Sequence, residues 1–374
     1  MTMLLSEEQA LLGDSAQALL ADQAPVSQQR RLRDERSATG FDDALWRQMV
    51  DMGWPVAVLP EAHDGLQVGY LGLGQVFEAI GRQLAAQPLL SQAVLAPELL
   101  IRAGSPAQQA QWLPKLAQGE ARLALALDEE SGRHWPAPLA TRVEPGEGSG
   151  TLHGAKHFVF DGVGADGFLV VAGSADAPSL WLVPAGAAGV QVERMAMIDS
   201  RNTARVRFDG VALEASMRLD AMPAAQALEQ VLDRARACVA AEALGLLRAM
   251  LETTVAYLKE RIQFDVPIGS FQALQHRAAR LYVELELLES CVGGALEAID
   301  AGDDAAIALH ASLAKARAAD LCEKLANEAV QLHGGIGVTD ELDLGLFFKR
   351  ARVLQRMLGD GAYHRNRYAR LKGF

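Results

Sequence analysis

The chain has 374 residues, of which 50% are hydrophobic, so it can form two or three domains with a sizeable buried core. Its formal net charge of -12 argues against a nucleic-acid partner, although a local basic pocket for a phosphorylated small molecule is compatible with it. The chain shows neither a signal peptide nor the roughly 18 to 20 uninterrupted apolar residues of a membrane helix, so we expect a cytoplasmic protein without a membrane partner.

The first third of the chain has helical spacing of its apolar residues. From Leu4 to about Gly119 the sequence is rich in Ala, Gln, Glu and Leu, with prolines between the helical windows. This pattern predicts an N-terminal all-helical domain over residues 1–120.

The central part has shorter apolar runs. Residues 168–173 (FLVVAG), 179–184 (SLWLVP) and 204–211 (ARVRFDGV) have strand length and are separated by Gly, Pro, Asp and Ser. They predict a small antiparallel, barrel-like β domain over residues 121–220.

Helical spacing returns near Ala224 and continues to the C-terminus. Apolar residues recur at helical intervals over 228–239 and 281–292, and a third helix is expected to start near Asp304. The patterns predict a C-terminal four-helix bundle over residues 221–374, and therefore an α+β multidomain protein.

Cysteine usage predicts reduced thiols. Cys238, Cys291 and Cys322 stand singly inside helical patterns, without the C-x-x-C spacing of metal or redox sites. We therefore expect buried, reduced cysteines, no disulfide and no metal site.

Glycines interrupt the third bundle helix in the segment QLHGGIGVTDEL, residues 331–342. A glycine that ends a helix is the ordinary structural explanation, and it accounts for one of them. Gly334 and Gly335 together indicate that the backbone approaches a flat or phosphorylated ligand closely. Gln331 offers a side-chain amide one turn earlier.

Five stretches, in this order, make the chain resemble the acyl-CoA dehydrogenase family. They are residues 45–66 (LWRQMVDMGWPVAVLPEAHDGL), 104–127 (GSPAQQAQWLPKLAQGEARLALAL), 154–166 (GAKHFVFDGVGAD), 261–276 (RIQFDVPIGSFQALQH) and 331–335 (QLHGG). The resemblance covers nearly the whole chain and implies the family's fold, with a helical domain, a central β domain and a C-terminal bundle.

The resemblance also implies contacts with FAD. A guanidinium can pair bidentately with a pyrophosphate, so Arg261 is the expected anchor, whereas in isolation a solvated arginine at a helix end would be the ordinary explanation. Phe264 and Gln272 would supply an apolar face and an amide. Asp265 departs from the family pattern, which usually has glycine there. In the family, Arg-x-x-Phe and Gln-x-x-Gly-Gly reach the FAD of a neighbouring subunit.

The implied reaction is the α,β-desaturation of an acyl-CoA thioester, with electrons passed to an electron-transfer flavoprotein. A carboxylate base removes the α-proton while the β-hydrogen leaves as hydride to the flavin. Because the α-carbon is a weak acid, that base must lie within about 3 Å of the proton's path in a dry pocket.

The usual base is absent from this sequence. A gap-free match of the tail places Leu358 where most members have glutamate, and Ala235 stands at the alternative glutamate position of the first bundle helix. Asp233 and Arg236 match residues that bind the CoA moiety. Asp360, two residues past Leu358, is a candidate base if the turn is remodelled, although an aspartate in Gly-Asp-Gly is more often a turn residue.

The β domain departs from the family as well. Where the family has Thr-Glu-Pro-x-x-Gly-Ser-Asp beside the flavin, this chain reads LDEESGRH over residues 127–134, and Leu127 has no hydroxyl. Phe158 could stack on the flavin ring, but Phe160 cannot donate a hydrogen bond. These departures predict a weakened flavin pocket of the chain's own.

The losses are asymmetric, and they suggest a partner subunit. The chain keeps the residues that reach a neighbour's FAD and loses those that serve its own, as in the second subunit of heteromeric α2β2 acyl-CoA dehydrogenases of bacterial steroid side-chain degradation. Two alternatives stay open. One is a self-sufficient dehydrogenase or related flavin oxidase, in a homotetramer, that uses Asp360. The other is an acyl-CoA-binding scaffold, against which the joint presence of Arg261, Phe264, Gln272 and Gln331 counts.

Overall fold

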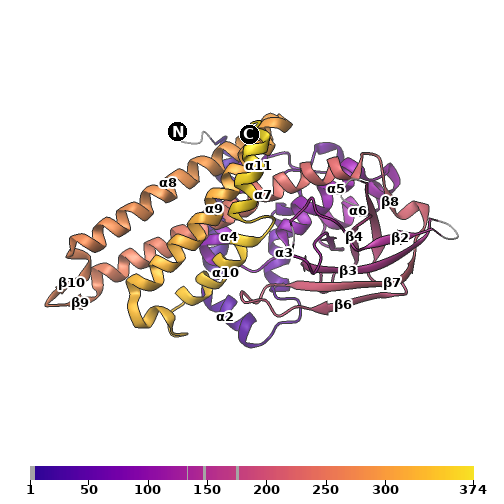
Figure 1. The fold of residues 1–374 in the computed structure, drawn as a ribbon. Coiled ribbons are helices and arrows are strands. Elements are labelled where there is room, and N and C mark those ends of the chain that lie inside the picture. Colours follow the sequence, from indigo (N-terminus) through magenta and orange to yellow (C-terminus); the bar gives the residue numbers. More distant parts are fainter. Residues whose placement is uncertain (1–4, 133, 146–148, 174–176) are drawn as a thin grey trace. The chain divides into compact units, whose positions relative to one another are not determined.

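The computed structural model describes residues 5–132, 134–145, 149–173 and 177–374, which form two compact units (Figure 1). The helical unit comprises Met1–Arg31, Val68–Ala85 and Arg236–Phe374, and the sheet unit comprises Leu32–Gln67 and Ala86–Ala235. These units group the elements differently from the three predicted chain segments, because the N-terminal helices are divided between the two units. The predicted domain ranges therefore stay predictions.

The helical unit is built on long helices. Ser6 caps α1 in a capping box with Gln9, and the Asp303 carboxylate accepts the Ala305 and Ala306 amides at the start of α9. The helices of the unit are α1 (Glu7–Gln23), α4 (Tyr70–Gln83), α7 (Ala224–Glu260, of which the part from Arg236 onward belongs here), α8 (Gln272–Ala301), α9 (Asp304–His333), α10 (Leu344–Arg356) and α11 (Gly361–Leu371). The predicted C-terminal bundle and its third helix from Asp304 are confirmed.

Two features bring the helices of this unit together. Gly245 of α7 lies so close to α4 that an added Cβ would stand 1.9 Å from the Glu78 carbonyl oxygen, so only glycine fits there. Arg350 of α10 pairs with Glu242 of α7 through two bonds, Nε to Oε1 at 2.8 Å and Nη2 to Oε2 at 2.9 Å, in the buried core. Helices α10 and α11 both pack against α9.

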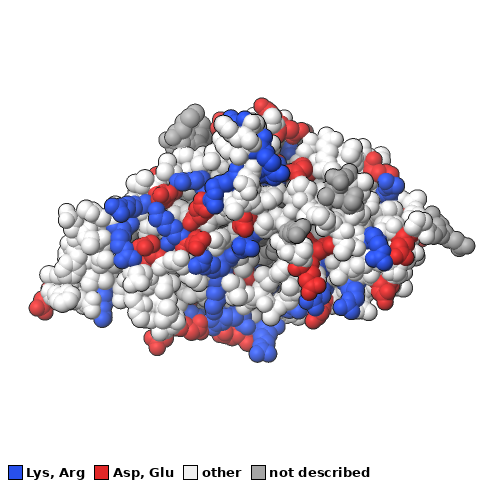
Figure 2. All heavy atoms as spheres, in the orientation of Figure 1, with Lys and Arg blue, Asp and Glu red and all other residues white. Residues whose placement is uncertain are grey.

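Short elements complete the helical unit. The hairpin of β9 (Ile262–Gln263) and β10 (Val266–Pro267) and the 3-10 turn η5 (Ile268–Ser270) connect α7 to α8, and the 3-10 turn η6 (Gly334–Val338) follows α9. On the face drawn in Figure 2, acidic and basic side chains are interspersed over the helices, while the tip that carries β9 and β10 is mostly uncharged.

The sheet unit contains two four-stranded sheets. One has the order β1-β4-β5-β8 and the other β2-β3-β7-β6. Their strands are β1 (Leu123–Ala126), β2 (Arg142–Glu144), β3 (Thr151–Phe160), β4 (Gly167–Gly173), β5 (Pro178–Pro184), β6 (Val190–Arg194), β7 (Thr203–Ala212) and β8 (Arg218–Leu219). The three predicted strands correspond to β4, β5 and β7. Pairing is antiparallel as predicted except between β1 and β4, which the sequence did not predict to be parallel.

Buried side chains of both sheets form one core. Phe168 of β4 and Phe208 of β7 meet edge to face, with ring centroids 6.5 Å apart, among buried Val, Leu and Ala residues. The short helices of the unit are α3 (Asp43–Asp51), α5 (Ala96–Ala103) and α6 (Pro106–Ala117), with the π-helical turn η3 (Leu90–Leu95) and the 3-10 turns η1 (Trp54–Val56), η2 (Glu61–His63) and η4 (Ala215–Met217). Helix α2 (Val26–Asp34) spans the division between the units.

Among the residues that the structure describes, no helix has the length and apolar character needed to cross a membrane. Cys238 and Cys322 are buried, Cys291 is half-buried, and all three are free thiols.

Candidate functional site

The hairpin between α7 and α8 forms an exposed tip. Gln263 lies opposite Val266, so Phe264 and Asp265 form a two-residue turn, and both have positive φ, 56° and 63°. Hairpin turns of this kind favour Asn and Gly, and aspartate tolerates the conformation better than phenylalanine does. Phe264 nevertheless leaves 86% of its surface exposed and meets the Phe271 ring edge-on at 6.1 Å between centroids. An apolar side chain held outward on such a turn is compatible with the predicted cofactor contact, which stays a prediction.

The ends of three helices meet beside this hairpin. The Tyr257 ring of α7 stacks on the His333 imidazole of α9, with 4.5 Å between centroids. Nε of Arg277 in α8 lies 2.7 Å from Oε2 of Glu328 in α9. The end of α7, the start of α8 and the end of α9 therefore form one end of the helical unit. The sequence analysis did not predict the stack of Tyr257 and His333.

The predicted FAD-binding side chains of the bundle extend from this end. Arg261 and Gln272 lie directly after α7 and at the start of α8, and Gln331 lies in the last turn of α9, and all three are exposed. Within the part of the chain that the structure describes, none of their side chains makes a hydrogen bond or ion pair. We call this surface the bundle tip and define it by Arg261, Phe264, Gln272, Gln331, Gly334 and Gly335.

The glycines after α9 have different physical reasons. Gly334 ends the helix with φ 66° and ψ −142°, a backbone region that is essentially restricted to glycine. A Cβ on Gly337 would stand 2.8 Å from the Val330 carbonyl oxygen, so close packing explains that glycine. A Cβ on Gly335 would meet nothing within 4 Å, and its φ is not positive. Nothing in the described chain therefore requires glycine at position 335, and its predicted contact with a ligand stays a prediction.

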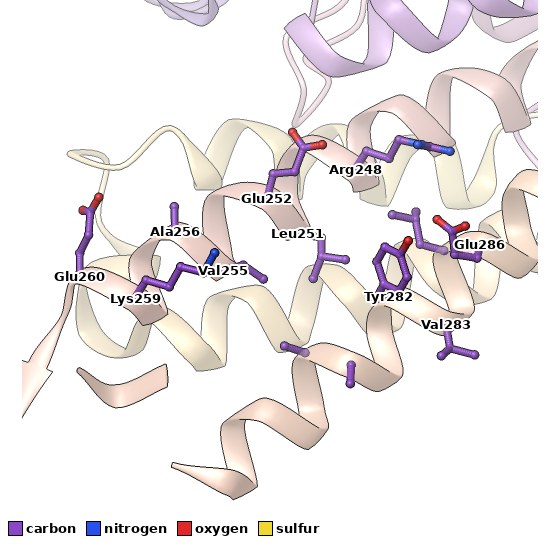
Figure 3. A pocket seen from close by; sticks show the side chains of 13 residues that line it. Arg248, Leu251, Glu252, Val255, Ala256, Lys259, Glu260, Tyr282, Val283 and Glu286 are labelled. Carbon is purple, nitrogen blue, oxygen red and sulfur yellow. The ribbon is translucent and has the colours of Figure 1, made fainter. Parts of the chain in front are cut away.

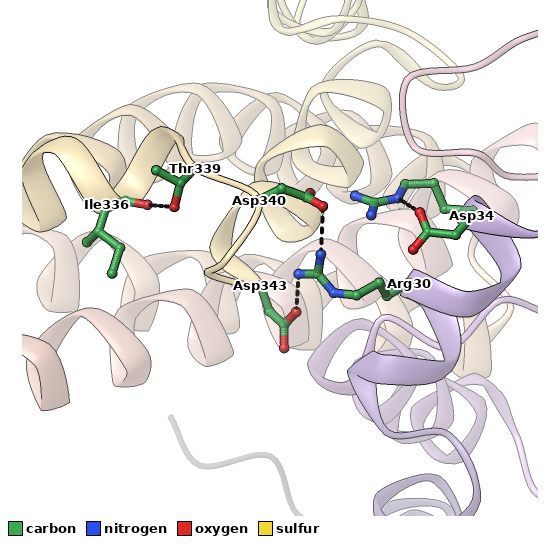
Figure 4. A network of polar contacts seen from close by, with 7 residues as sticks. Arg30, Asp34, Ile336, Thr339, Asp340 and Asp343 are labelled. Carbon is green, nitrogen blue, oxygen red and sulfur yellow. Dashed lines mark hydrogen bonds and ion pairs between the residues drawn. The ribbon is translucent and has the colours of Figure 1, made fainter.

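The segment that follows the glycine turn is fixed by one arginine (Figure 4). Arg30 Nη1 lies 2.8 Å from Asp340 Oδ2, and its Nη2 lies 2.7 Å from Asp343 Oδ1. The Thr339 hydroxyl donates to the Ile336 carbonyl oxygen at 2.9 Å. The two ion pairs connect the segment that follows the bundle tip to α2.

A groove of about 740 Å³ runs between α7 and α8 (Figure 3). It combines apolar and charged side chains, and Tyr282 and Val283 are 56% and 58% exposed. Exposed apolar surface of this kind is typical of protein interfaces. The residues that line the groove are Arg248, Leu251, Glu252, Val255, Ala256, Lys259, Glu260, Ala278, Ala279, Tyr282, Val283, Leu285 and Glu286, so no residue of the bundle tip takes part.

The turn between α10 and α11 carries the position of the missing base. Leu358 has φ 57° and Gly359 φ 117°, which reverses the chain before α11. Asp360 is the N-cap of α11: its Oδ1 accepts the Tyr363 amide at 2.9 Å, and its Oδ2 lies 3.6 Å from Arg356 Nη1. A helix N-terminus and a guanidinium both favour the ionised carboxylate.

Three nitrogen-bearing side chains hold the carbonyl groups of this turn from inside the helical unit. Arg236 Nε of α7 donates to the Leu358 carbonyl oxygen at 3.2 Å, and His364 Nε2 of α11 lies 3.1 Å from the same oxygen. Lys315 Nζ of α9 donates to the Gly359 oxygen at 2.7 Å. Burial and the nearby cations depress the pKa of His364 to about 2, so the imidazole is neutral. Its one N–H is then on Nε2, which donates to the Leu358 carbonyl oxygen.

Arg236 is buried, with 1% of its surface exposed, and its Nη2 also donates to the Tyr363 hydroxyl at 3.2 Å, a bond within the helical unit. A direct role of Arg236 and Asp233 toward the CoA moiety stays a prediction. Asp233 and Ala235 are both buried on α7. The sequence analysis missed Lys315 and His364, because a lone lysine and histidine on helices are usually solvated.

In the sheet unit, Phe158 lies at an irregularity of β3, between the paired residues Lys156 and Val159. It has φ 53°, is 36% exposed, and its amide donates to Met195 Sδ at 3.4 Å. The positive φ strains the backbone at Phe158, and the partly exposed ring is compatible with the predicted stacking on a flat ligand. That stacking stays a prediction. Leu127 is buried.

A buried ion pair fixes the segment that follows Leu127. Lys156 Nζ lies 2.9 Å from Glu129 Oε1 and donates to the Leu127 carbonyl oxygen at 3.0 Å. Burial acts to raise the pKa of Glu129, but the Ala140 and Thr141 amides together with Lys156 hold it below its usual value. Lys156 of β3 thus fixes both the Leu127 carbonyl group and the Glu129 side chain.

Comparison with known proteins gives a consistent match. The family model "Acyl-CoA dehydrogenase, N-terminal domain" matches residues 6–120, and "Acyl-CoA dehydrogenase, C-terminal domain" matches residues 224–372. Acyl-CoA dehydrogenase FadE27 of Mycobacterium tuberculosis is 33% identical over 327 residues, which are 85% of each chain.

Two solved structures are similar over nearly their whole length. A variant of the Tcur3481-Tcur3483 steroid ACAD is 31% identical, with a TM-score of 0.87, and 98% of each chain is covered. A chain of the ChsE4-ChsE5 complex from Mycobacterium tuberculosis is 29% identical, with a TM-score of 0.89, and 100% of this chain and 99% of that chain are covered.

Proposed function

This chain belongs to the acyl-CoA dehydrogenase family, and from that premise we propose that it completes the FAD site of a partner subunit and does not itself carry the catalytic base. The enzyme is then an FAD-dependent oxidoreductase that desaturates an acyl-CoA thioester and works as a heteromer. The single observation that carries the proposal is the contrast between an exposed, unbonded bundle tip and a base position occupied by Leu358.

The bundle tip fits the chemistry of a flavin dinucleotide. Arg261 is an exposed guanidinium suited to a pyrophosphate, Gln272 and Gln331 offer amides, and Gly335 allows close backbone approach. Bound FAD supplies the hydride acceptor for the desaturation. Because these side chains face outward, they serve a cofactor held mainly by another chain.

The geometry of Asp360 argues against the self-sufficient alternative. A general base that removes a weakly acidic α-proton needs a raised pKa and free lone pairs. One carboxylate oxygen of Asp360 instead accepts a hydrogen bond from the Tyr363 amide, and the other faces Arg356. The carboxylate thus has a structural role as the N-cap of α11, which favours a partner that brings its own base.

The sheet unit supports the same proposal. Leu127 is buried and has no hydroxyl, and Phe160 cannot donate a hydrogen bond to a flavin. The Lys156–Glu129 pair uses the polar groups beside Leu127 internally. A chain with these features holds a flavin of its own weakly.

We propose partners by the same reasoning. The ChsE4-ChsE5 complex and the Tcur3481-Tcur3483 steroid ACAD are each named for two chains, and the second is named for steroid substrates. A base-carrying acyl-CoA dehydrogenase subunit is therefore the proposed partner in a heterotetramer. The proposed substrate is an acyl-CoA with a steroid-type acyl group, and the proposed electron acceptor is an electron-transfer flavoprotein. The proposed compartment is the cytoplasm. A scaffold that has lost FAD would have no use for the bundle tip.

The test is the flavin content of the chain alone and together with a base-carrying subunit. We expect the chain alone to be colourless, and the co-expressed complex to bind one FAD for every two chains and to reduce it with acyl-CoA. An active homotetramer saturated with flavin would overturn the proposal, and Asp360 would become the candidate base.

A further inference from the structure

Lys315 occupies an unusual place for a lysine. Its side chain is 0% exposed in the core of the helical unit, where Nζ donates to the Gly359 carbonyl oxygen at 2.7 Å and to the Gln355 carbonyl oxygen at 3.4 Å. Carbonyl oxygens are dipoles, so they compensate a buried ammonium only partly. The chain therefore keeps a costly group at one specific turn.

The titratable and charged groups that act on Lys315 come from three helices. Arg236 of α7 adds a positive charge, Asp360 at the start of α11 adds a negative one, and Cys322 of α9 lies nearby. Burial raises the pKa of the Cys322 thiol to about 12, so it stays neutral and gives no counter-charge. His364 of α11 is neutral as well. Asp360 is thus the one carboxylate that acts on Lys315 among the groups that set its charge.

We propose that Lys315 is a positioning residue for the Met357–Asp360 turn, the turn that carries the family's base position, and that a proton on Lys315 loosens this turn. The inference rests on the proposed function only in taking this turn as the family's base position. With Arg236 and His364 on the Leu358 oxygen and Lys315 on the Gly359 oxygen, consecutive carbonyl groups are held from three helices. The direction of the side chain at position 358 and the N-cap of α11 both depend on these bonds.

The sign of the proton effect follows from linkage. Burial lowers the pKa of Lys315 from 10.5 to about 7 in the closed turn. When the turn opens, the amine meets water and its pKa returns toward 10.5. Protons therefore bind the open state more tightly, so lowering the pH from 10.5 to 7 favours opening by up to tenfold per pH unit. Below pH 7 both states are protonated and the effect levels off.

The test is amide hydrogen exchange of the full-length chain, followed by mass spectrometry between about pH 6 and pH 9. Protection is the exchange rate of an unstructured peptide divided by the measured exchange rate at the same pH. This ratio removes the intrinsic pH dependence of exchange. In the wild type we expect protection of residues 358–364 to rise about tenfold per pH unit above pH 7 and to be constant below it. Residues 168–173 of β4 and 178–183 of β5 in the sheet unit serve as an internal reference without that slope.

Two variants separate the lysine's role from general stability. Lys315→Met keeps most of the volume but removes the proton, so the slope should vanish while the reference stays protected. Lys324→Met is the matched control on the same helix, because Lys324 is 50% exposed and pairs with Glu284, and it should keep the slope. A wild type without the slope, or a Lys315→Met protein that retains it, overturns the inference. Neither result depends on flavin content, so failure here and failure of the proposed function are distinguishable.

Discussion

The bundle tip and the Met357–Asp360 turn belong to the same helical unit, yet their polar groups are used in opposite ways. At the bundle tip, Arg261, Gln272 and Gln331 are exposed, and their side chains make no bond within the described chain. At the turn, the Leu358 and Gly359 carbonyl groups are bonded by buried side chains. The polar groups of the turn are thus bonded inside the protein, whereas those of the bundle tip are open to solvent, and we propose that they serve a ligand.

The comparison explains why one half of a family site can persist without the other. The bundle tip needs only exposed side chains on a rigid frame, so it survives as long as the helices do. The turn is held by Arg236, Lys315 and His364. In the proposed function, Leu358 stands at the position of the base and a partner subunit supplies the base instead.

The largest expected effect tests the buried ion pair of Arg350 and Glu242. Arg350→Met leaves the Glu242 carboxylate buried without its bidentate partner, so we expect the free energy of unfolding to fall by about 3–5 kcal/mol. Chemical denaturation followed by circular dichroism measures this change. Arg277→Met is the control, because the Arg277 and Glu328 side chains are 34% and 33% exposed and the pair should contribute about 0–1 kcal/mol. Equal losses in the two variants would contradict the distinction between a buried and an exposed ion pair.

The next effect tests the bundle tip and should appear in cofactor binding only. Arg261→Ala removes a charged donor to the pyrophosphate, so FAD affinity of the assembled enzyme should fall about 10- to 100-fold. The free energy of unfolding should change by less than about 0.5 kcal/mol, since the side chain is exposed. Fluorescence titration of the apoenzyme with FAD gives the affinity.

Arg280→Ala is the matched control for that titration. Arg280 is also an exposed arginine of the same helix region, on α8, but it lies outside the bundle tip. FAD affinity should stay at the wild-type value. If both variants lose affinity equally, a general effect of surface charge replaces the specific contact.

A smaller effect is expected at Asp360. Asn caps helices about as well as Asp, so Asp360→Asn should preserve α11, and the activity of the heteromer should stay within about threefold of the wild type. A general base would instead lose more than about 100-fold. Steady-state rates with acyl-CoA decide between them. Asp320→Asn, at an exposed carboxylate paired with Arg365, controls for the loss of one surface charge.

The sequence predicted the elements whose pattern is local and failed where partners are distant. The end of α9 before Gly334 and the strands β4, β5 and β7 follow from spacing and glycine chemistry. The parallel pairing of β1 with β4 did not, because it joins segments separated by a long connection. The sequence analysis did not predict the burial of Lys315 and Arg236 for a related reason: it depends on carbonyl groups more than 40 residues away. Sequence spacing carries no information on such bonds.

The smallest expected effect concerns the backbone of the hairpin turn. Asp265 has φ 63° at the second turn position, where glycine meets no Cβ penalty, so Asp265→Gly should raise the free energy of unfolding by about 0.5 kcal/mol. Gln263→Gly, in the extended strand of the same hairpin, should lower it by a similar amount because glycine there only adds backbone freedom to the unfolded chain. Denaturation midpoints of the two variants measure these two opposite changes in the free energy of unfolding. Since Asp265→Gly leaves the turn's shape unchanged, FAD affinity of the heteromer should also be unchanged. A loss of affinity would mean that the Asp265 carboxylate itself belongs to the bundle tip.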